Sequence, residues 1–271
     1  MIALFTVIPL AVAFVIWIIG ARIRRLPSLI ATLACLCAVS VGIFCMINLW
    51  ETGFRPMVYF VGGWKPPIGI SMVLDGLSLL MLLIVNIVAL AAVIFSISYM
   101  TQYTDESKYY TLFMLMLAGM NGVIVTGDLF NMFVFMEIAT IASTALVAFG
   151  TEHEELEASF RYIVLATVAS LLILLGIGIL YAHTSTLNLA DISVELAGKK
   201  STGIAGFVMI MFLMGFGLKS AVVPFHAWLP DAHPSAPAPI SAMLSGVLIK
   251  SLGVYALVRI AFNIVGVKIL N

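Results

Sequence analysis

Charged residues are scarce in this sequence. The 271 residues include 13 Lys and Arg and 13 Asp and Glu, so 10% of the chain is charged, whereas a soluble domain carries about a quarter. Positive and negative charges cancel, and no strongly basic stretch is present, so nucleic acid is not an expected partner. The low charge therefore predicts a protein that lies in a membrane rather than in water.

Cysteine is nearly absent as well. The three cysteines, Cys35, Cys37 and Cys45, lie in one apolar run without the spacing of a metal or disulfide framework, so we expect them to pack between helices. The sequence has no phosphate-binding loop, nucleotide signature or haem-type histidine pair, and its Ser, His and Asp residues form no nucleophilic set. These absences predict no cofactor, no metal site and no redox centre in this chain.

Long hydrophobic runs fill the rest of the sequence. They are continuous for about 20 residues, the length of a membrane-spanning helix, and do not alternate as the strands of a membrane barrel do. The predicted fold is an all-α, polytopic bundle of about eight helices. The first run has no basic residues before it and no small-residue cleavage site, so we expect a retained span rather than a signal peptide. The predicted spans are 1–20, 29–50, 74–99, 109–126, 129–149, 160–182, 203–225 and 238–262.

The connections divide the chain into three predicted parts. Residues 1–108 hold the first three spans and an interfacial loop, 51–73, which is rich in Gly, Pro and aromatic residues that suit the membrane surface. Residues 109–262 form a five-helix ion-translocating unit, and residues 263–271 form a tail.

Basic residues indicate the orientation in the membrane. Arg22, Arg24 and Arg25 lie in the short loop after the first span, which favours a cytoplasmic loop and an external N-terminus. Lys108 and Arg161 fall on the same side. The opposite side receives Arg55, Lys65, Lys199, Lys200 and Lys268. The two sides carry equal numbers, so the predicted orientation depends on the cluster nearest the first span.

Three charged residues, Glu137, Lys219 and Lys250, lie well inside predicted spans. Each costs about 2.5–3.5 kcal/mol at the centre of a bilayer, and such groups face a bundle interior or a hydrated cavity. Opposite charges lower this cost when they meet, so we expect Glu137 beside Lys219. One interpretation is a static ion pair that joins helices, although apolar packing replaces such a pair at no loss of stability. The other is a relay, because an acid and two amines in a row can hand on a proton.

A proline explains how water could reach this row. Pro224 has no N–H and clashes with the carbonyl of Ser220, so we expect the helix to open one residue after Lys219. Open backbone at membrane depth is tolerated where it is buried in protein or lines a hydrated cavity, and broken helices recur at the ion sites of transporters.

The polar run after the break adds His226, Asp231 and His233. Either imidazole could pass protons between Lys219 and Lys250, while the alternatives are a hydrogen-bonded interior residue for His226 and a surface turn for His233. Two His and one Asp at irregular spacing across prolines do not match a zinc pattern. Asp231 is an expected entrance or cap.

Two further acids, Asp75 and Asp128, lie at the ends of predicted spans. Both are expected to cap helices or to lie at the membrane surface. Asp128 comes nine residues before Glu137, so it is also a candidate proton entrance.

The residues around the break resemble a known signature. It covers KSAVVPFHAWLPDAH from Lys219 to His233 and the APAPISA that follows from Ala236, and it is similar to the signature of the antiporter-like subunits of respiratory complex I. The same family includes the Mrp-type cation/proton antiporters and the membrane arms of membrane-bound hydrogenases. Glu137, at the end of FVFME, resembles the fifth-helix glutamate of the family, and Lys219 and Lys250 resemble its seventh-helix and eighth-helix lysines.

The resemblance implies a proton or sodium channel around a broken seventh helix, powered from elsewhere in a large complex of the inner (cytoplasmic) membrane. The segment SAMLSGVLIK resembles the branch with the complex I fourth-type subunit, the Mrp D-type subunit and the hydrogenase subunits. The branch of the fifth-type subunit usually has a histidine in place of Ser245 and no lysine at Lys250.

Members of this family usually have about fourteen helices in two inverted five-helix units. The last five predicted spans, within residues 109–262, resemble the first unit, so we expect either a neighbouring chain that supplies the second half or contact with a full-length relative. The expected partners are other membrane subunits, including homologous ones, lipid, and H⁺ or Na⁺. A row of lysines suits protons better than Na⁺, which prefers oxygen ligands.

Two functions follow. The first is an ion-translocating subunit of a redox-driven pump or Mrp-type antiporter. The alternative is a structural or assembly subunit of the same kind of complex, with no transport of its own.

Overall fold

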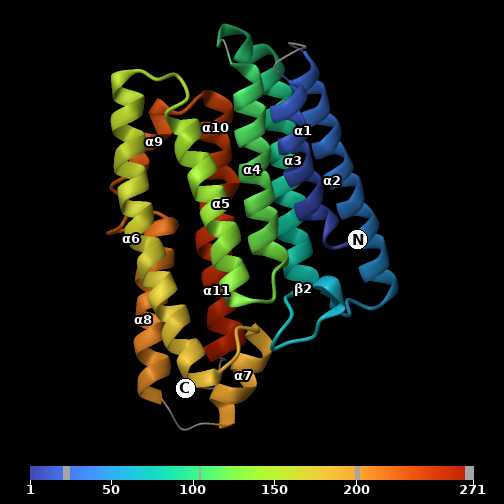
Figure 1. Ribbon diagram of the computed structural model, residues 1–271, viewed down its shortest axis with the longest axis vertical. Helices are drawn as coiled ribbons and strands as arrows, with labels where there is room; N and C mark the ends of the chain where they lie inside the picture. The colour runs from blue at the N-terminus through green and yellow to red at the C-terminus, as the bar shows by residue number, and fades with distance from the viewer. Residues whose placement is uncertain (21–24, 104, 199–201, 266–271) are drawn as a thin grey trace.

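The structure, a computed structural model, describes residues 1–20, 25–103, 105–198 and 202–265. Its helices run side by side along the long axis of the molecule (Figure 1). Within the described ranges, six segments are long and apolar enough to cross a membrane, and two shorter apolar helices accompany them. The shorter pair is α1 (Leu4–Ile19) and α8 (Thr202–Lys219). The six are α2 (Leu26–Glu51), α3 (Gly76–Tyr99), α4 (Glu106–Val125), α5 (Leu129–Val147), α6 (His153–Thr184) and a C-terminal segment from Ala238. The predicted all-α membrane bundle is therefore confirmed.

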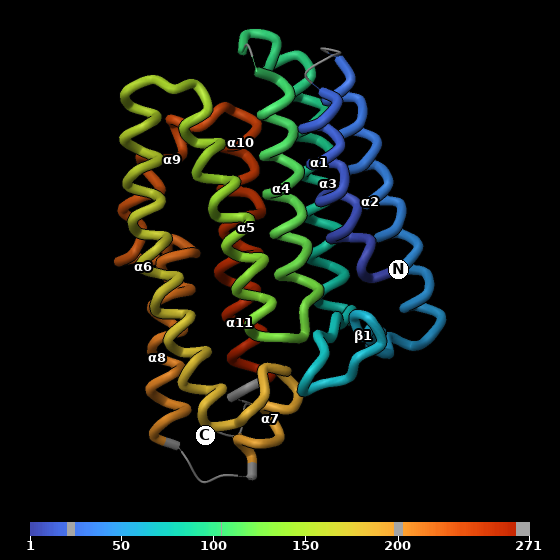
Figure 2. Tube along the Cα trace, viewed as in Figure 1, coloured from blue at the N-terminus to red at the C-terminus, as the bar shows by residue number. Residues whose placement is uncertain are grey.

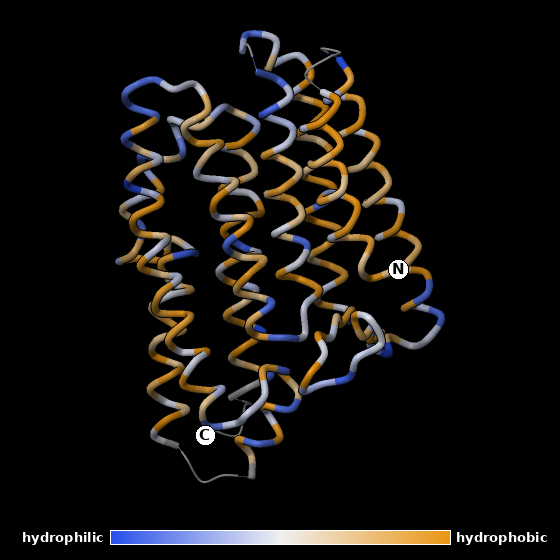
Figure 3. The backbone as a smooth tube through the Cα atoms, in the orientation of Figure 1, coloured by the Kyte–Doolittle hydropathy of each residue, from blue (hydrophilic) through white to orange (hydrophobic). Residues whose placement is uncertain are grey.

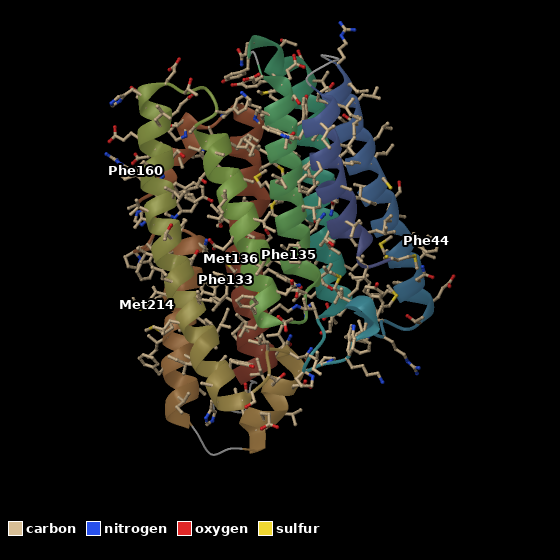
Figure 4. The ribbon with its side chains drawn as sticks, viewed as in Figure 1. Phe44, Phe133, Phe135, Met136, Phe160 and Met214 are labelled. Atoms are coloured by element: carbon tan, nitrogen blue, oxygen red, sulfur yellow. The ribbon has the colours of Figure 1, made fainter. Side chains whose placement is uncertain are left out.

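The outside of the bundle is apolar. Figure 3 shows hydrophobic residues along most of the helices and hydrophilic residues gathered at the two ends. Large apolar side chains are exposed on opposite sides, such as Phe44 on α2 and Phe160 on α6 (Figure 4). Lipid tails suit such a surface, because a membrane helix satisfies its backbone hydrogen bonds internally and needs no polar exterior.

Helix α4 lies at the centre of the helix packing in the bundle. Helices α1 and α5 pack against it, α2 packs against α3, and α6 packs against both α5 and α8. A buried amide pair joins three of these helices: Asn86 of α3 and Asn121 of α4 bond to each other at 3.0 Å, and Asn121 also donates to the carbonyl of Phe5 in α1. Interhelical amide bonds of this kind hold membrane helices together where no hydrophobic force acts between them.

Acidic residues fix where several helices begin. The Asp75 carboxylate accepts from the backbone N–H of Ser78 at 2.9 Å, which satisfies a free donor at the start of α3. Helix α6 begins at His153, earlier than the predicted start at 160, because Glu152 and Glu155 form a capping box in the acidic link.

The predicted interfacial loop contains a β-hairpin. Strand β1 (Met57–Phe60) pairs antiparallel with β2 (Ser71–Leu74), and the short helix η1 (Val61–Gly63) begins the connection. An extended connection was expected instead, since strands of four residues are too short to show a period in the sequence. Trp50 and Trp64, at 73% and 65% exposure, are available to a membrane surface.

The polar connection after α6 contains a helix, α7 (Leu189–Gly198). It lies beside the turn between α4 and α5, where the backbone N–H of Leu189 donates to the carbonyl of Gly127 at 3.0 Å. Near the other end of the bundle, the short helix η2 (Met100–Gln102) ends α3. Five basic residues of the orientation argument or the tail lie outside the described residues: Arg22, Arg24, Lys199, Lys200 and Lys268.

The last predicted span is a continuous but irregular rod. It consists of α10 (Ala238–Met243), η3 (Leu244–Leu248), η4 (Lys250–Tyr255), α11 (Ala256–Ile260) and η5 (Ala261–Val265), and is named the C-terminal rod below. The three η segments are π-helical, with turns wider than those of an α-helix, and such turns are frequent at functional sites. The rod packs against α3, α4 and α8.

Helix α8 ends inside the bundle. Figure 2 follows it from the lower end of the molecule to a break near mid-height, after which the chain continues to α9 (Leu229–Ser235) near the upper end. The predicted span 203–225 was therefore too long, because its helix stops at Lys219.

Candidate ion-translocation site

A buried ion pair joins α5 to the broken end of α8. The Nζ atom of Lys219 lies 3.1 Å from Oε1 of Glu137. The Lys219 side chain is 3% exposed and that of Glu137 is 30% exposed, so the lysine is the more deeply buried of the two. Met136, the residue before Glu137, lies near the middle of α5 (Figure 4), which places the pair within the membrane-spanning part of the bundle.

Two hydroxyl groups complete the surroundings of the pair. Ser170 of α6 donates to Oε1 of Glu137 at 2.5 Å, the same oxygen that Lys219 binds. Lys219 donates a second hydrogen bond to Oγ1 of Thr140 at 2.9 Å, one turn of α5 beyond Glu137. Both hydroxyls are buried, so three helices converge on two opposite charges.

The break begins directly after the lysine. The N–H groups of Ser220 and Val222 still reach back to Phe216 and Gly217, but Ala221 has φ of 51°, a left-handed conformation that ends the helix. Pro224 lies exposed in the turn that follows. The Lys219 side chain is thus held at a helix terminus rather than in a regular turn.

Tight packing holds the broken end against the C-terminal rod. A Cβ atom built on Gly253 would lie 2.8 Å from the Cα of Ser220, closer than real side chains come to a backbone. Glycine is therefore required here for the rod to approach the break.

Lys250 is exposed on the rod and is not joined to the buried pair by a hydrogen bond or ion pair in the described part of the chain. Its Nζ donates to the carbonyl of Ser245, within the π-helical stretch. His233 is also exposed, and its Nε2 bonds the hydroxyl of Ser245 at 3.2 Å. Two of the predicted relay residues therefore meet at Ser245, apart from Glu137 and Lys219.

The two other titratable residues of the broken segment, His226 and Asp231, lie at the surface. His226 is exposed in the turn between α8 and α9. Asp231 pairs with Arg161 of α6 at 2.5 Å, and Arg161 also pairs with Glu157 at 2.6 Å. This exposed network holds α9 on α6. A role of Asp231 in ion entry stays a prediction.

Asp128 is buried at the start of α5. Its carboxylate accepts from the N–H of Asn131 at 2.8 Å, as a helix cap does. Burial raises the pKa of Asp128, while hydrogen bonds from the backbone of Asn131 and Phe130 lower it in part. Asp128 lies nine positions before Glu137, about 14 Å along the helix axis, so the structure does not bring these two carboxylates together.

Asp75 has a partner that sequence reasoning missed. Burial acts to raise its pKa, but hydrogen bonds from Arg259 and Ser78 outweigh it and lower the pKa to about 2. Arg259 of the rod binds both carboxylate oxygens, at 2.5 and 2.6 Å, and its Nε donates to the hydroxyl of Tyr255. A cavity of about 480 Å³ lies beside this ion pair and extends to the start of α7.

Sequence reasoning also missed the groups that hold the buried pair. Ser170 and Thr140 are hydroxyl residues inside apolar helices, and nothing in their spacing distinguishes them from others that bond their own backbone. Trp228 donates from Nε1 to the carbonyl of Leu218 at 3.0 Å. The only sequence signal for Trp228 is its place in the polar run.

Comparisons with known proteins identify the family. Residues 126–270 match the model of "NADH:quinone oxidoreductase/Mrp antiporter, TM", which is more than half of the chain. The chain belongs to this family. Residues 65–114 match "NADH-Ubiquinone oxidoreductase (complex I), chain 5 N-terminus". The resemblance drawn from the residues around Lys219 is therefore confirmed, and the chain is an antiporter-like, multi-span membrane subunit.

The relatives that match this antiporter-like chain are longer proteins. It is 39% identical over 220 residues to the N-type subunit of the NADH-quinone oxidoreductase of Desulforudis audaxviator, covering 80% of this chain and 44% of that protein. It is 31% identical over 256 residues to the D-type subunit of the Na⁺/H⁺ antiporter of Alkalihalophilus pseudofirmus, covering 93% and 51%.

A solved structure shows the same arrangement. A chain of the membrane-bound sulfane sulfur reductase, an archaeal respiratory membrane complex, superposes with a TM-score of 0.92 at 33% identity, covering 99% of this chain and 54% of that one. The antiporter-like chain thus spans about half the length of the relatives that it matches.

Proposed function

We propose that this antiporter-like chain contributes half of a cation channel to a multisubunit redox-driven pump or Mrp-type antiporter of the cytoplasmic membrane. The observation that carries the proposal is the Glu137–Lys219 pair, 3.1 Å apart at the end of a helix that breaks within the bundle. Buried charges at membrane depth are costly and mark ion pathways in membrane proteins.

The contacts of Lys219 favour proton transfer over a static ion pair that only joins helices. Its ammonium group has two acceptors, Glu137 and Thr140. When Glu137 takes up a proton and loses its charge, Thr140 still accepts a hydrogen bond from the ammonium group. The ammonium group therefore keeps a buried hydrogen-bond partner when the charge of Glu137 changes.

Lys250 is the next member of the proposed path. It lies exposed on a membrane-spanning rod, where lipid would disfavour it. We assign this face to a partner chain that carries the second half of the channel or to a full-length homologous subunit. The exposure of a charged side chain on this face of the rod supports this assignment. The proposed cation is H⁺, because the path consists of amines and an acid rather than the oxygen cage that Na⁺ prefers.

The transport test compares buried charges with exposed ones. Lys219→Ala and Glu137→Gln are introduced into the intact complex, and cation-coupled proton transport is measured in inverted membrane vesicles. Lys108→Ala and Glu157→Gln are matched controls, because both residues form exposed ion pairs. We expect transport to fall to background for the buried variants, with unchanged amounts of assembled complex, and to persist in the controls.

The structural alternative predicts a different outcome. If the charges only hold the complex together, Lys219→Ala either leaves coupled transport normal or prevents assembly. Either result in both buried variants would contradict the proposal.

A labelling experiment tests the partner face. Lys250→Cys is made with Cys37→Ser, which removes the exposed native thiol while leaving the buried Cys35 and Cys45. We expect a maleimide reagent to label position 250 in the separately expressed chain and not in the assembled complex. Equal labelling in both would overturn the assignment of this face.

A further inference from the structure

We propose that Tyr162 and Trp228 form a positioning element that holds Lys219 against Glu137. The proposal rests on the proposed function, since it concerns the same ion pair. Among the described residues, neither aromatic side chain forms a hydrogen bond with Glu137 or Lys219, so both act through other residues.

The two rings form a stacked pair across the break. Trp228 follows the break and is 2% exposed, and Tyr162 lies on α6 and is 3% exposed. Their ring centroids lie 4.2 Å apart and their planes differ by 8°. The segment between α8 and Trp228 is largely exposed, so this stack is where it is anchored in the bundle.

Trp228 also fixes the end of α8. Its Nε1 donates to the carbonyl of Leu218, the residue before Lys219, at 3.0 Å. The same carbonyl also accepts from the N–H of Ala221 at 3.2 Å, and the indole adds a side-chain donor from beyond the break to this last turn of α8. Trp228 thus helps to hold the turn from which the Lys219 side chain extends.

Tyr162 connects the stack to the helix that carries Glu137. Its hydroxyl lies 2.9 Å from Oγ of Ser143, and Ser143 donates its single hydroxyl hydrogen to the carbonyl of Thr140. Tyr162 is therefore the donor to Ser143. Thr140 in turn accepts from Lys219.

These contacts close a ring, named the positioning ring below. It runs through Lys219, Thr140, Ser143, Tyr162, Trp228 and Leu218. A closed ring keeps the lysine in register with α5 even though the helix that bears it has ended. Breaking the ring at any one point is expected to loosen the pair without removing either charge.

The test breaks the ring at two points with minimal change. Trp228→Phe keeps a stacking ring and removes the N–H donor, and Tyr162→Phe keeps the stack and removes the hydroxyl. We expect each to lower coupled transport about fivefold, the effect of losing one hydrogen bond of about 1 kcal/mol, and to shift the pH profile of transport. The exposed Trp64→Phe and Tyr181→Phe are controls with the same chemistry.

A double variant separates the ring from ordinary packing. Thr140→Val removes the contact of Lys219 with the ring, so adding Trp228→Phe should cause little further loss if both act through one unit. The positioning role would be overturned if the double variant lost transport by the product of the two single-variant factors. It would also be overturned if the single variants transported at the wild-type rate with the wild-type pH profile. If Trp228→Phe lowers the amount of complex, Tyr162→Phe, which removes one oxygen atom, decides the question.

Two outcomes distinguish this inference from the proposed function. If Lys219→Ala abolishes transport while Trp228→Phe and Tyr162→Phe match the controls, the positioning ring alone is wrong. If Lys219→Ala transports normally, the proposed function is wrong and the inference falls with it.

Discussion

Removing the two charges of the buried pair should destabilise the protein unequally. Glu137→Leu leaves the Lys219 ammonium, whose side chain is 3% exposed, with Thr140 as its remaining partner. Loss of one partner from a buried pair costs about 3–5 kcal/mol, so we expect a loss in this range. Lys219→Met leaves a carboxylate that is 30% exposed and still accepts from Ser170. We expect about 1–2 kcal/mol there, the cost of one lost hydrogen bond to a group that water reaches.

The double variant completes the cycle. Glu137→Leu with Lys219→Met removes both charges, and replacing a buried pair with apolar groups is often neutral, so we expect stability within about 1 kcal/mol of the parent. The single losses then sum to more than the double loss, which gives a coupling free energy of about 3 kcal/mol or more between the two side chains.

Thermal unfolding of the purified protein in lipid discs measures these differences. For a chain of this size each kcal/mol shifts Tm by about 2–4 °C, so Glu137→Leu should lower Tm by about 6–20 °C. Glu157→Leu, which breaks an exposed pair, is the control and should change Tm little. An equal or larger loss for Lys219→Met, or additive losses in the double variant, would show that the burial difference does not control the energetics.

Two further predictions concern the C-terminal rod. Gly253→Ala places a methyl group 2.8 Å from the Cα of Ser220 and should impair both stability and transport. Gly206→Ala on α8 is the control, because no atom lies within 4 Å of the added methyl group, and it should be neutral or stabilising by up to about 1 kcal/mol. The two variants are compared by Tm and by transport in vesicles. Asp75 has a pKa of about 2 in the folded state against 3.8 for its ordinary value, so its pairing with Arg259 stabilises the protein above about pH 4 and is lost as the pH falls toward 2. Asp75→Asn should therefore lower Tm at pH 6, and the difference in Tm between this variant and the parent should be smaller at pH 3. A difference in Tm that is the same at both pH values would contradict the ion pair.

The sequence predicts the buried pair because membrane physics leaves few alternatives. A glutamate and a lysine inside apolar helices lower their cost by meeting, and a proline five residues after Lys219 requires the helix to end nearby. The approximate positions of the helices follow from hydropathy for the same reason. These are consequences of charge and backbone chemistry that do not depend on the details of packing.

The rest depends on packing that one sequence does not show. Ser170, Thr140 and Tyr162 look like ordinary residues of apolar helices, and only the fold brings them to one place. Arg259 was overlooked because a charge near the end of a span can reach the membrane surface along its own side chain. Which side of the rod Lys250 occupies depends on the π-helical turns, whose register hydropathy does not reveal.

In the proposed function, the exposure of Lys250 connects assembly to transport. An ammonium group on a lipid-facing rod costs about 2.5–3.5 kcal/mol, and a partner chain that offers water or acceptors removes that cost on binding. We therefore expect the charge to destabilise the separate chain and to stabilise the proposed complex. Lys250→Met should accordingly raise the Tm of the separately expressed chain in lipid, while weakening its association with the partner and abolishing coupled transport. Lys65→Met, outside the predicted spans, is the control. A Lys250→Met chain that is no more stable alone, yet assembles and transports normally, would show that this lysine neither faces lipid nor takes part in the path.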